Sequence, residues 1–338
     1  MRLWQRCCRF LADPDVAIDL GTANTRLYVV DRGLVADEPT IVSAENEAPI
    51  ALLSQGGDPN EQTDRFLTPL SRGVVRDVDA TARLLGKLLK RARRFGLIKS
   101  RALVCAPSEA SPNERSALLE AVSRSGVSAV KVLPEPLASA VGAGLDISSP
   151  YAQMLADIGD GVTDVAVIRS RRVVLARTLH RACGDLRSAV QRSVAKQNNL
   201  FLYRREAERL VRESGAVGAE AASKTLPVLA LDRQGRTITM ELSRREVSAA
   251  VHPVIAEIVA TIRQTIERLS PDLAVEVMES GICLTGGGAC LRGIDDVIAS
   301  ETSLDVKIPA DPLHATINGA SEMLVASTRS ELWETGSF

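Results

Sequence analysis

The sequence has few aromatic and histidine residues and almost no net charge. Of its 338 residues, 3% are aromatic and 3 are His, and the formal net charge is −1. Because nucleic-acid binding needs an excess of basic residues, we expect no nucleic-acid partner. The chain is 45% hydrophobic and 25% charged, which is typical of a globular protein, and it is long enough for two domains.

Long apolar runs and metal-ligand spacings are also absent. No apolar run approaches the roughly 20 residues of a transmembrane helix, and the N-terminus lacks the pattern of a cleaved signal peptide. The 6 cysteines show no metal-ligand spacing and mostly lie in apolar runs. We therefore expect free thiols in a reducing cytoplasm.

A turn rich in Gly and Asp lies between two apolar runs in the middle of the chain. Residues 154–168, MLADIGDGVTDVAVI, have the pattern of a tight strand-turn-strand hairpin. Gly159 and Gly161 let the backbone approach a ligand, and the consecutive amides can bind an anion. Asp157, at the strand end, can hold a hydrated Mg²⁺. Many such hairpins bind nothing, so this pattern alone does not establish a site.

The same layout occurs near the N-terminus, in residues 16–30. Aligning DLGTANT (19–25) with DIGDGVT (157–163) matches Asp, Gly and Thr at the same three positions. An internal repeat of this kind predicts two related halves that clamp a nucleoside triphosphate between their hairpins. A short apolar strand, GICLT, followed by Gly286, Gly287 and Gly288, is a third candidate contact. A Gly triplet is also consistent with a plain turn.

Two segments have the pattern of a membrane contact. Residues 1–13 predict an amphipathic helix with apolar side chains on one arc and arginines on the other, as in interfacial helices. Packing of this helix on the protein's own surface is the alternative. A second apolar tip follows a basic helix end, and it is either a membrane contact or a helix-to-strand link. The residues expected to enter an anionic membrane are Leu3, Trp4, Phe10, Leu11, Phe95 and Leu97.

Between these motifs, predicted strands and helices alternate. Helical periodicity is clear at 78–94 and at 244–269, where Pro253 predicts a kink or restart. Shorter helices are expected at 137–144 and 291–299. The segment 44–69 is polar and rich in turn residues, so we expect a loop-dominated excursion there.

The motifs resemble the nucleotide-site motifs of the actin and heat-shock-chaperone ATPase superfamily, with spellings closest to the bacterial MreB family. The resemblance covers residues 16–326 and rests on the two hairpins and three further motifs: LPEPLASAVG from Leu133, LTGGGA from Leu284 and DPLHATINGA from Asp311. It implies an α/β, actin-like ATPase fold, with two related domains around a nucleotide cleft. Each domain would have a larger inner and a smaller outer subdomain.

The resemblance also implies domain boundaries. Domain I would comprise residues 14–144 and 312–338, with an outer subdomain at about 33–69. Domain II would comprise residues 145–311, with an outer subdomain at about 183–247. We treat these limits as predictions.

The resemblance implies a role for each residue of an ATP–Mg²⁺ site. Asp19 and Asp157 would hold the metal through water, and Glu135 would position the attacking water. Thr163 would supply an assisting hydroxyl, and Asp164 is a further catalytic candidate. A protein catalyses phosphoryl transfer mainly by positioning the reactants and neutralising the charge on the phosphates. The other implied nucleotide contacts are Gly21, Thr22, Ala23, Asn24, Gly159, Asp160, Gly161, Glu208, Arg212, Gly286, Gly287 and Gly288.

The function implied is that of a slow ATPase that forms cytoskeletal filaments. The filaments would lie in the cytoplasm, peripheral to the inner face of the cell membrane, and organise cell-wall synthesis and cell shape. The implied partners are further copies of the chain, a paralogous bacterial actin, the anionic membrane surface and membrane proteins of cell-wall synthesis.

Three departures from the family pattern keep an alternative open. Asp160 resembles the eukaryotic actin spelling, Val211 stands where the superfamily usually has Lys near the ribose, and segment 44–69 is shorter than usual. The alternative is a nucleotide-binding scaffold that has lost efficient hydrolysis or self-assembly. A small-molecule kinase is a further alternative, but no second polar cluster for a phosphoryl acceptor is evident near Glu135.

Overall fold

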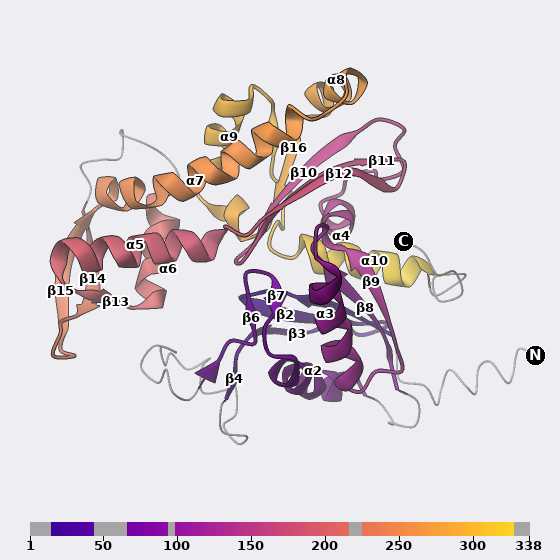
Figure 1. Cartoon of the computed structure of the whole chain (residues 1–338), viewed down its shortest axis with the longest axis horizontal. Coiled ribbons are helices and arrows are strands. Elements are labelled where there is room, and N and C mark those ends of the chain that lie inside the picture. The colour runs from indigo at the N-terminus through magenta and orange to yellow at the C-terminus, as the bar shows by residue number, and fades with distance from the viewer. Residues whose placement is uncertain (1–14, 44–65, 94–98, 216–224, 328–338) are drawn as a thin grey trace, which may run out of the picture.

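Two five-stranded sheets of the same topology form the framework of the fold (Figure 1). In the computed structural model, which describes residues 15–43, 66–93, 99–215 and 225–327, their strand orders are β3-β2-β1-β8-β9 and β12-β11-β10-β16-β17. In both sheets the central strand pairs antiparallel on one side and parallel on the other. The repeat of two short motifs therefore belongs to a repeat of whole sheets.

The first sheet is covered by two pairs of helices. On one face, apolar residues of β1 pack with α2 and α3, and on the other face β1, β8 and β9 pack with α4 and α10. β1 is accordingly buried along its whole length. The elements are β1 (Val16–Leu20), β2 (Asn24–Val29), β3 (Gly33–Pro39), α2 (Val78–Ala92), β8 (Arg101–Ala106), α3 (Pro112–Arg124), β9 (Ala129–Pro134), α4 (Glu135–Gly142) and α10 (Ala315–Ser327).

Helix α2 illustrates how the sequence sets these elements. The Asp77 side chain caps its N-terminus by accepting a hydrogen bond from the Ala80 amide at 2.8 Å, and such caps contribute about 1 kcal/mol. Leu84, Leu85 and Leu88 lie on one side of the helix and are buried in the core. The predicted helix at 78–94 is thus confirmed up to Ala92, where it ends; Arg94 lies outside the described residues.

Each five-stranded sheet and the elements packed on it form one lobe of the protein, and the lobe of the second sheet also carries an additional small sheet (Figure 1). Strands β13, β14 and β15 form this three-stranded sheet, and α5 and α6 pack near it. The elements are β10 (Gln153–Ile158), β11 (Thr163–Arg169), β12 (Arg172–Leu179), α5 (Cys183–Asn198), β13 (Phe201–Leu202), α6 (Arg204–Ser214), β14 (Thr225–Leu231), β15 (Thr237–Ser243), α7 (Arg244–Ile266), α8 (Pro271–Ser280), β16 (Ile282–Thr285), α9 (Ile294–Thr302) and β17 (Val306–Lys307).

Helices α4 and α10 lie together where the two lobes meet (Figure 1). Their backbones touch at two glycines. A Cβ on Gly142 would lie 1.8 Å from the Ala315 carbonyl oxygen, and one on Gly319 would lie 1.9 Å from the Ala138 carbonyl oxygen. Both positions therefore need glycine for this close approach.

Four short strands lie between β3 and α2 in the chain: β4 (Val42–Ser43), β5 (Phe66–Leu67), β6 (Leu70–Ser71) and β7 (Val74–Val75). They pair as two small hairpin-like units, β4 with β5 and β6 with β7. Strand β3, which the predicted outer subdomain included, instead forms the edge of the five-stranded sheet through its pairing with β2.

The structure adjusts three helix predictions. Helix α7 does not restart at Pro253 but continues through it, because its apolar face is packed in the core and this packing outweighs one lost backbone hydrogen bond. Helix α4 begins at Glu135, since Pro136 is tolerated in a first turn. The helix predicted at 291–299 is present as α9 but begins three residues later, because Gly293 adopts a left-handed conformation before it; a short 3₁₀ helix, η4 (Gly287–Cys290), precedes it.

The predicted membrane contacts lie outside the described residues. This applies to the helix at 1–13 with Leu3, Trp4, Phe10 and Leu11, and to Phe95 and Leu97. Residues 44–65 of the predicted loop-dominated segment also lie outside the described residues. Among the helices that the structure describes, none is long and apolar enough to span a bilayer.

Candidate functional site

A cavity of about 350 Å³ lies between the lobes, lined by residues of both sheets and of the helices at their junction. It brings together most of the predicted site residues. Thr163, Asp164 and Gly288 are not among the lining residues. The predicted residues that line it are Asp19, Gly21, Thr22, Ala23, Asn24, Glu135, Asp157, Gly159, Asp160, Gly161, Glu208, Arg212, Gly286 and Gly287.

The turns of the β1–β2 and β10–β11 hairpins have matching geometry. The Gly21 amide donates to the Asn24 carbonyl oxygen at 3.0 Å, and the Gly159 amide donates to the Val162 carbonyl oxygen at 2.9 Å. The two turns also touch, since a Cβ on Gly161 would lie 2.2 Å from Thr22 Oγ1. The repeat thus places two equivalent backbone turns, one from each sheet, in contact with each other in the lining of one cavity.

The turn between β6 and β7 contacts both hairpins, and none of its residues was predicted to belong to the site. The Gly73 amide donates to Thr22 Oγ1 at 2.8 Å. Across the cleft, a Cβ on Gly73 would lie 2.8 Å from Val162 Cγ1, and His180 Nδ1 lies 3.2 Å from the Arg72 carbonyl oxygen. The local Arg-Gly turn signal was visible in the sequence, but its contact with the other lobe was not.

Two buried carboxylates lie at the bases of the hairpins. Asp19 is 5% exposed and Asp157 is 6% exposed. Burial raises the pKa of Asp19, although Arg26 opposes this with Nη1 3.0 Å from Asp19 Oδ2. Burial likewise raises the pKa of Asp157. A cation between them would stabilise both charged forms. Arg26, which also pairs with Asp37 at 3.3 Å, was not predicted.

Asp157 is held by both junction helices. Ser139 on α4 donates to Asp157 Oδ2 at 2.7 Å, and Thr316 on α10 donates to the same oxygen at 3.4 Å. The two hydroxyl oxygens lie 2.9 Å apart. The position of this carboxylate is therefore tied to the helices that join the lobes.

Glu135 and Asp164 add two further acidic groups near the hairpin bases. Burial, together with the charges of Asp164, Asp157 and Asp19, raises the pKa of Glu135 well above its usual range. Burial raises the pKa of Asp164 to about 7. Asp164 accepts hydrogen bonds from the Thr178 hydroxyl and, at 3.4 Å, from the Ser108 amide.

Thr163 is the first residue of β11 and pairs with Ile158 where the turn of the second hairpin closes. It is fully buried, and its hydroxyl donates to the Arg181 carbonyl oxygen at 2.8 Å. The Thr163 hydroxyl thus bonds to the backbone of the protein, and Thr163 is not among the residues that line the cavity.

The donor set fits a hydrated Mg²⁺. Among the residues that the structure describes, no group of three or more His, Cys, Asp or Glu side chains could hold a metal ion by itself. Mg²⁺ keeps several waters and commonly binds one or two carboxylates together with phosphates. Asp19 and Asp157, both lining the cavity, supply such a pair. Phosphates and water would complete the coordination.

At another part of the cavity, α5 and α6 contribute charged side chains. Arg187 Nη1 lies 2.6 Å from Asp160 Oδ1. Burial lowers the pKa of Arg187, but the hydrogen bond and charge of Asp160 and the charge of Glu208 outweigh it and leave the pKa raised. On α6, Val211 is buried, and Arg212 pairs with Glu208 at 3.3 Å. Arg187 was not predicted, because its helix has no local signal for a site.

The Gly triplet packs against the second hairpin. Gly286 has a φ of 78°, and a Cβ there would lie 2.3 Å from Asp157 Oδ1. A Cβ on Gly288 would lie 2.3 Å from Ile158 Cγ2. Gly286 and Gly287 line the cavity, so this turn forms one of its walls.

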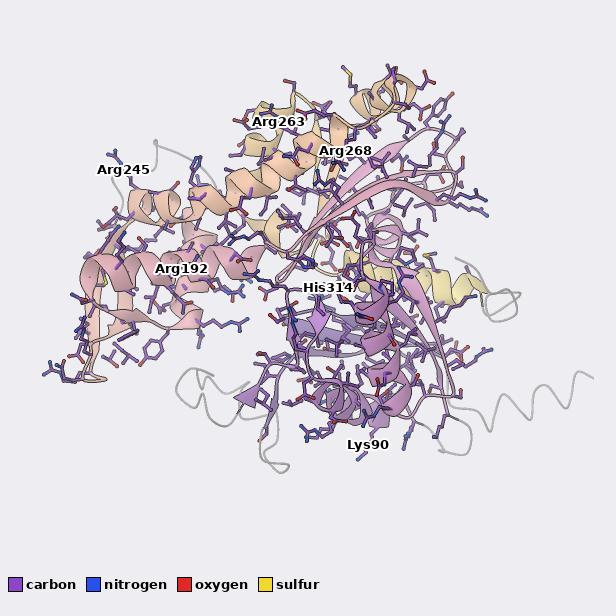
Figure 2. The ribbon with its side chains drawn as sticks, viewed as in Figure 1. Lys90, Arg192, Arg245, Arg263, Arg268 and His314 are labelled. Carbon is purple, nitrogen blue, oxygen red and sulfur yellow. The ribbon has the colours of Figure 1, made fainter. Side chains whose placement is uncertain are left out.

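His314 lies where the lobes meet, just before α10 (Figure 2). Its Nε2 lies 3.2 Å from Asp37 Oδ2, and its Nδ1 lies 2.9 Å from Asp311 Oδ1. Asp37 in turn pairs with Arg26. A chain of polar contacts therefore runs from the first hairpin to the segment that enters α10.

Comparison with known proteins identifies the family. A family model described as MreB/Mbl protein matches residues 13–331. The chain belongs to the MreB/Mbl family. It is 32% identical over 330 residues to the cell shape-determining protein MreB of Pasteurella multocida, covering 94% of each chain. It is 30% identical over 318 residues to the Mbl protein of Bacillus subtilis, covering 92% of this chain and 95% of that protein.

Solved structures of the family share the fold. MreB5 of Spiroplasma citri bound to AMPPNP superposes with a TM-score of 0.84 at 26% identity, covering 94% of this chain and 97% of that one. The same protein bound to ADP gives a TM-score of 0.86 at 25% identity, covering 96% and 100%. The predicted actin-like fold and family are thereby confirmed.

Proposed function

We propose that this MreB/Mbl family protein binds ATP and Mg²⁺ in the cavity between its lobes. The observation that carries the proposal is the meeting of two equivalent hairpins, each with a buried carboxylate at its base, in one cavity. Burial raises the pKa of both carboxylates, even though Arg26 pairs with Asp19, and a bound cation would stabilise their charged forms. Similarity to MreB5, solved with AMPPNP and with ADP, supports the nucleotide.

Each part of the site has a distinct task in this proposal. The Gly21 and Gly159 amides close the two turns by donating to Asn24 and Val162, so the amides that follow them in the turns, including that of Gly161, bind phosphate oxygens. Asp19 and Asp157 hold the hydrated metal, which neutralises charge on the phosphates when bound. The close contact of Gly161 with Thr22 brings donors of both lobes within reach of one polyphosphate, so binding favours the closed arrangement of the lobes.

We propose slow hydrolysis, with Glu135 positioning the attacking water. Glu135 lies at the start of α4, and its pKa is raised by burial and by Asp164, Asp157 and Asp19. A carboxylate with a raised pKa can accept a proton near neutral pH. We expect Glu135→Ala to keep ATP binding and lose hydrolysis. Glu135→Gln should likewise keep ATP binding and lose hydrolysis, with a smaller change in side-chain volume.

The alternative is a nucleotide-binding scaffold with little or no turnover. It is favoured by Thr163, whose hydroxyl donates to Arg181 and does not line the cavity. Phosphate release by the wild type, abolished in Glu135→Ala, would exclude this alternative. Tight binding without phosphate release would establish it.

We also propose that the protein assembles into filaments on the cytoplasmic face of the cell membrane, where it contributes to cell shape and cell-wall synthesis. The relatives from P. multocida and B. subtilis are named as cell shape-determining proteins. The N-terminal amphipathic pattern supports the membrane contact, because many weak helices on one filament bind with high avidity.

A sedimentation assay tests assembly and membrane binding together. Protein is centrifuged with ATP, ADP or no nucleotide, with and without anionic liposomes, while phosphate release is followed. We expect ATP-dependent pelleting and lipid binding that is lost on deletion of residues 1–13 or in Trp4→Glu. Monomers under all conditions would refute assembly. Lipid binding lost only when Phe95 and Leu97 are changed would assign the contact to the loop.

A further inference from the structure

Arg187 is a buried arginine that faces the cavity and has no role in the site proposed so far. It is 8% exposed and belongs to the cavity lining. A buried guanidinium is unfavourable unless it is paired and hydrogen-bonded. Its partner is Asp160, at 2.6 Å, which is the residue that departs from the bacterial spelling of the hairpin. The positive charge of Arg187 is therefore held next to the Asp160 carboxylate in the lining of the cavity.

The pair is held rigidly by the contact of α5 with the second hairpin. The Gly184 amide donates to the Asp160 carbonyl oxygen at 2.8 Å, and the Cys183 amide donates to the Gly159 carbonyl oxygen at 3.2 Å. A Cβ on Gly184 would lie 2.9 Å from the Asp160 carbonyl oxygen. The start of the helix and the hairpin turn are thus locked together, and Arg187 follows one turn later on the same helix.

One carboxylate oxygen of Asp160, Oδ2, can accept a hydrogen bond from a ligand. Oδ1 pairs with Arg187, while Oδ2 lies 3.8 Å from Arg204, beyond hydrogen-bond distance. Both Asp160 and Glu208 line the cavity, and the charges of both act on Arg187. Carboxylates of this kind bind ribose hydroxyl groups in nucleotide sites.

The two α6 cations near the site are less well placed than Arg187. Arg204 lies 3.8 Å from Asp160 with a side chain 37% exposed, and the Arg212 side chain is 65% exposed and pairs with Glu208 on the same helix. Exposed pairs of this type contribute little. Arg187, with a side chain 10% exposed, is therefore the better candidate for the positive charge beside the sugar.

We infer that Arg187 is a positioning residue, which fixes Asp160 as an acceptor for the ribose hydroxyl groups and makes the cleft selective for ribonucleotides over 2′-deoxyribonucleotides. The inference rests on the proposed nucleotide binding. Arg187 also balances the charge of Asp160, which would otherwise repel the polyphosphate. Without the arginine, the position of the Asp160 carboxylate is no longer fixed and its negative charge is no longer balanced.

The test compares affinities for ATP and 2′-deoxy-ATP in the presence of Mg²⁺. A hydrogen bond to a charged group predicts a wild-type preference for ATP of about ten- to hundredfold. In Arg187→Met this ratio should fall to about one, mainly through weaker ATP binding, and Arg187→Lys should restore part of it. Arg192→Met is the matched control, because Arg192 is exposed on the same helix (Figure 2), and it should behave as the wild type.

Several results would overturn the inference. Arg187 would have a purely structural role if the affinity ratio were unchanged in Arg187→Met. The same would follow if this variant lost affinity for both nucleotides equally and unfolded at a lower temperature. If the preference for ATP over 2′-deoxy-ATP were lost in Arg212→Met instead, Arg212 on α6 would be the positioning residue. If Arg187→Met does not fold, Asp160→Asn provides the same test and should also lower the ratio.

The two proposals fail in different ways. Wild-type protein that binds both nucleotides equally would overturn the role of Arg187 alone and leave the proposed function standing. Wild-type protein that binds neither nucleotide would refute the proposed function and the inference together.

Discussion

The contact between α4 and α10 predicts opposite effects of the same substitution at two helical glycines. Gly319 lies in α10 and Gly86 lies in α2. A Cβ on Gly86 would have its nearest neighbour at 3.5 Å, which is an ordinary contact, whereas a Cβ on Gly319 would lie 1.9 Å from a backbone carbonyl oxygen. Gly86→Ala is therefore the matched control for Gly319→Ala.

The magnitudes follow from two opposing effects. Alanine is favoured over glycine in a helix by roughly 1 kcal/mol, and this gain applies at both positions. At Gly319 the shortfall from 3.4 Å to 1.9 Å is 1.5 Å, and it has to be relieved by moving one helix backbone against another. Overpacking typically destabilises by about 1 to 3 kcal/mol, and a backbone clash belongs near the upper end. We expect Gly319→Ala to lose about 2 kcal/mol and Gly86→Ala to gain up to about 1 kcal/mol.

Urea unfolding of the nucleotide-free protein, followed by circular dichroism, measures both changes. The midpoint should fall for Gly319→Ala and rise for Gly86→Ala, while the slope of the transition stays the same. If both variants were stabilised, the close approach of α4 and α10 would be wrong, and so would the account of how the junction holds Asp157.

Three further predictions concern the cavity. Gly161→Ala should weaken ATP binding at least tenfold in a titration, because its Cβ would lie 2.2 Å from Thr22 Oγ1; unchanged affinity would contradict the closed contact of the hairpins. Ser139→Ala should reduce the Mg²⁺ dependence of ATP binding, because it removes a 2.7 Å hydrogen bond that orients Asp157; wild-type Mg²⁺ dependence would argue against that role. Burial raises the pKa of Asp164 from 3.8 to about 7, so the folded protein keeps a proton that the unfolded chain releases, and stability is lost as the pH rises through 7. Asp164→Asn should therefore stabilise the nucleotide-free protein increasingly from pH 4 to pH 8, by up to roughly 4 kcal/mol, and a difference independent of pH in urea unfolding would refute this.

The parts of the site that could be predicted from sequence are those encoded locally. Alternating apolar runs around Gly and Asp indicate the hairpins at Asp19 and Asp157, since backbone turns of this type need those residues. The repeat of the motif then indicates that the two hairpins share one ligand. The structure places both in the cavity lining.

The parts that could not be predicted depend on contacts between distant segments. Arg187 and Arg26 occur in an ordinary helix and an ordinary strand, and only the packing of the sheets brings them to Asp160 and Asp19. The β6–β7 turn similarly shows a local turn signal, but its hydrogen bond to Thr22 spans the fold. The unbroken course of α7 through Pro253 shows the same dominance of tertiary packing over a local preference.

The central claim is that one ATP and Mg²⁺ bind between the two hairpins. Isothermal titration of ATP into the wild type, Asp19→Asn, Asp157→Asn and the exposed control Asp272→Asn, each with Mg²⁺ and with EDTA, tests it most directly. We expect the wild type and the control to bind one ATP per chain in a Mg²⁺-dependent manner, and both hairpin variants to lose that dependence. Equal, Mg²⁺-independent binding by all four proteins would contradict the proposed site.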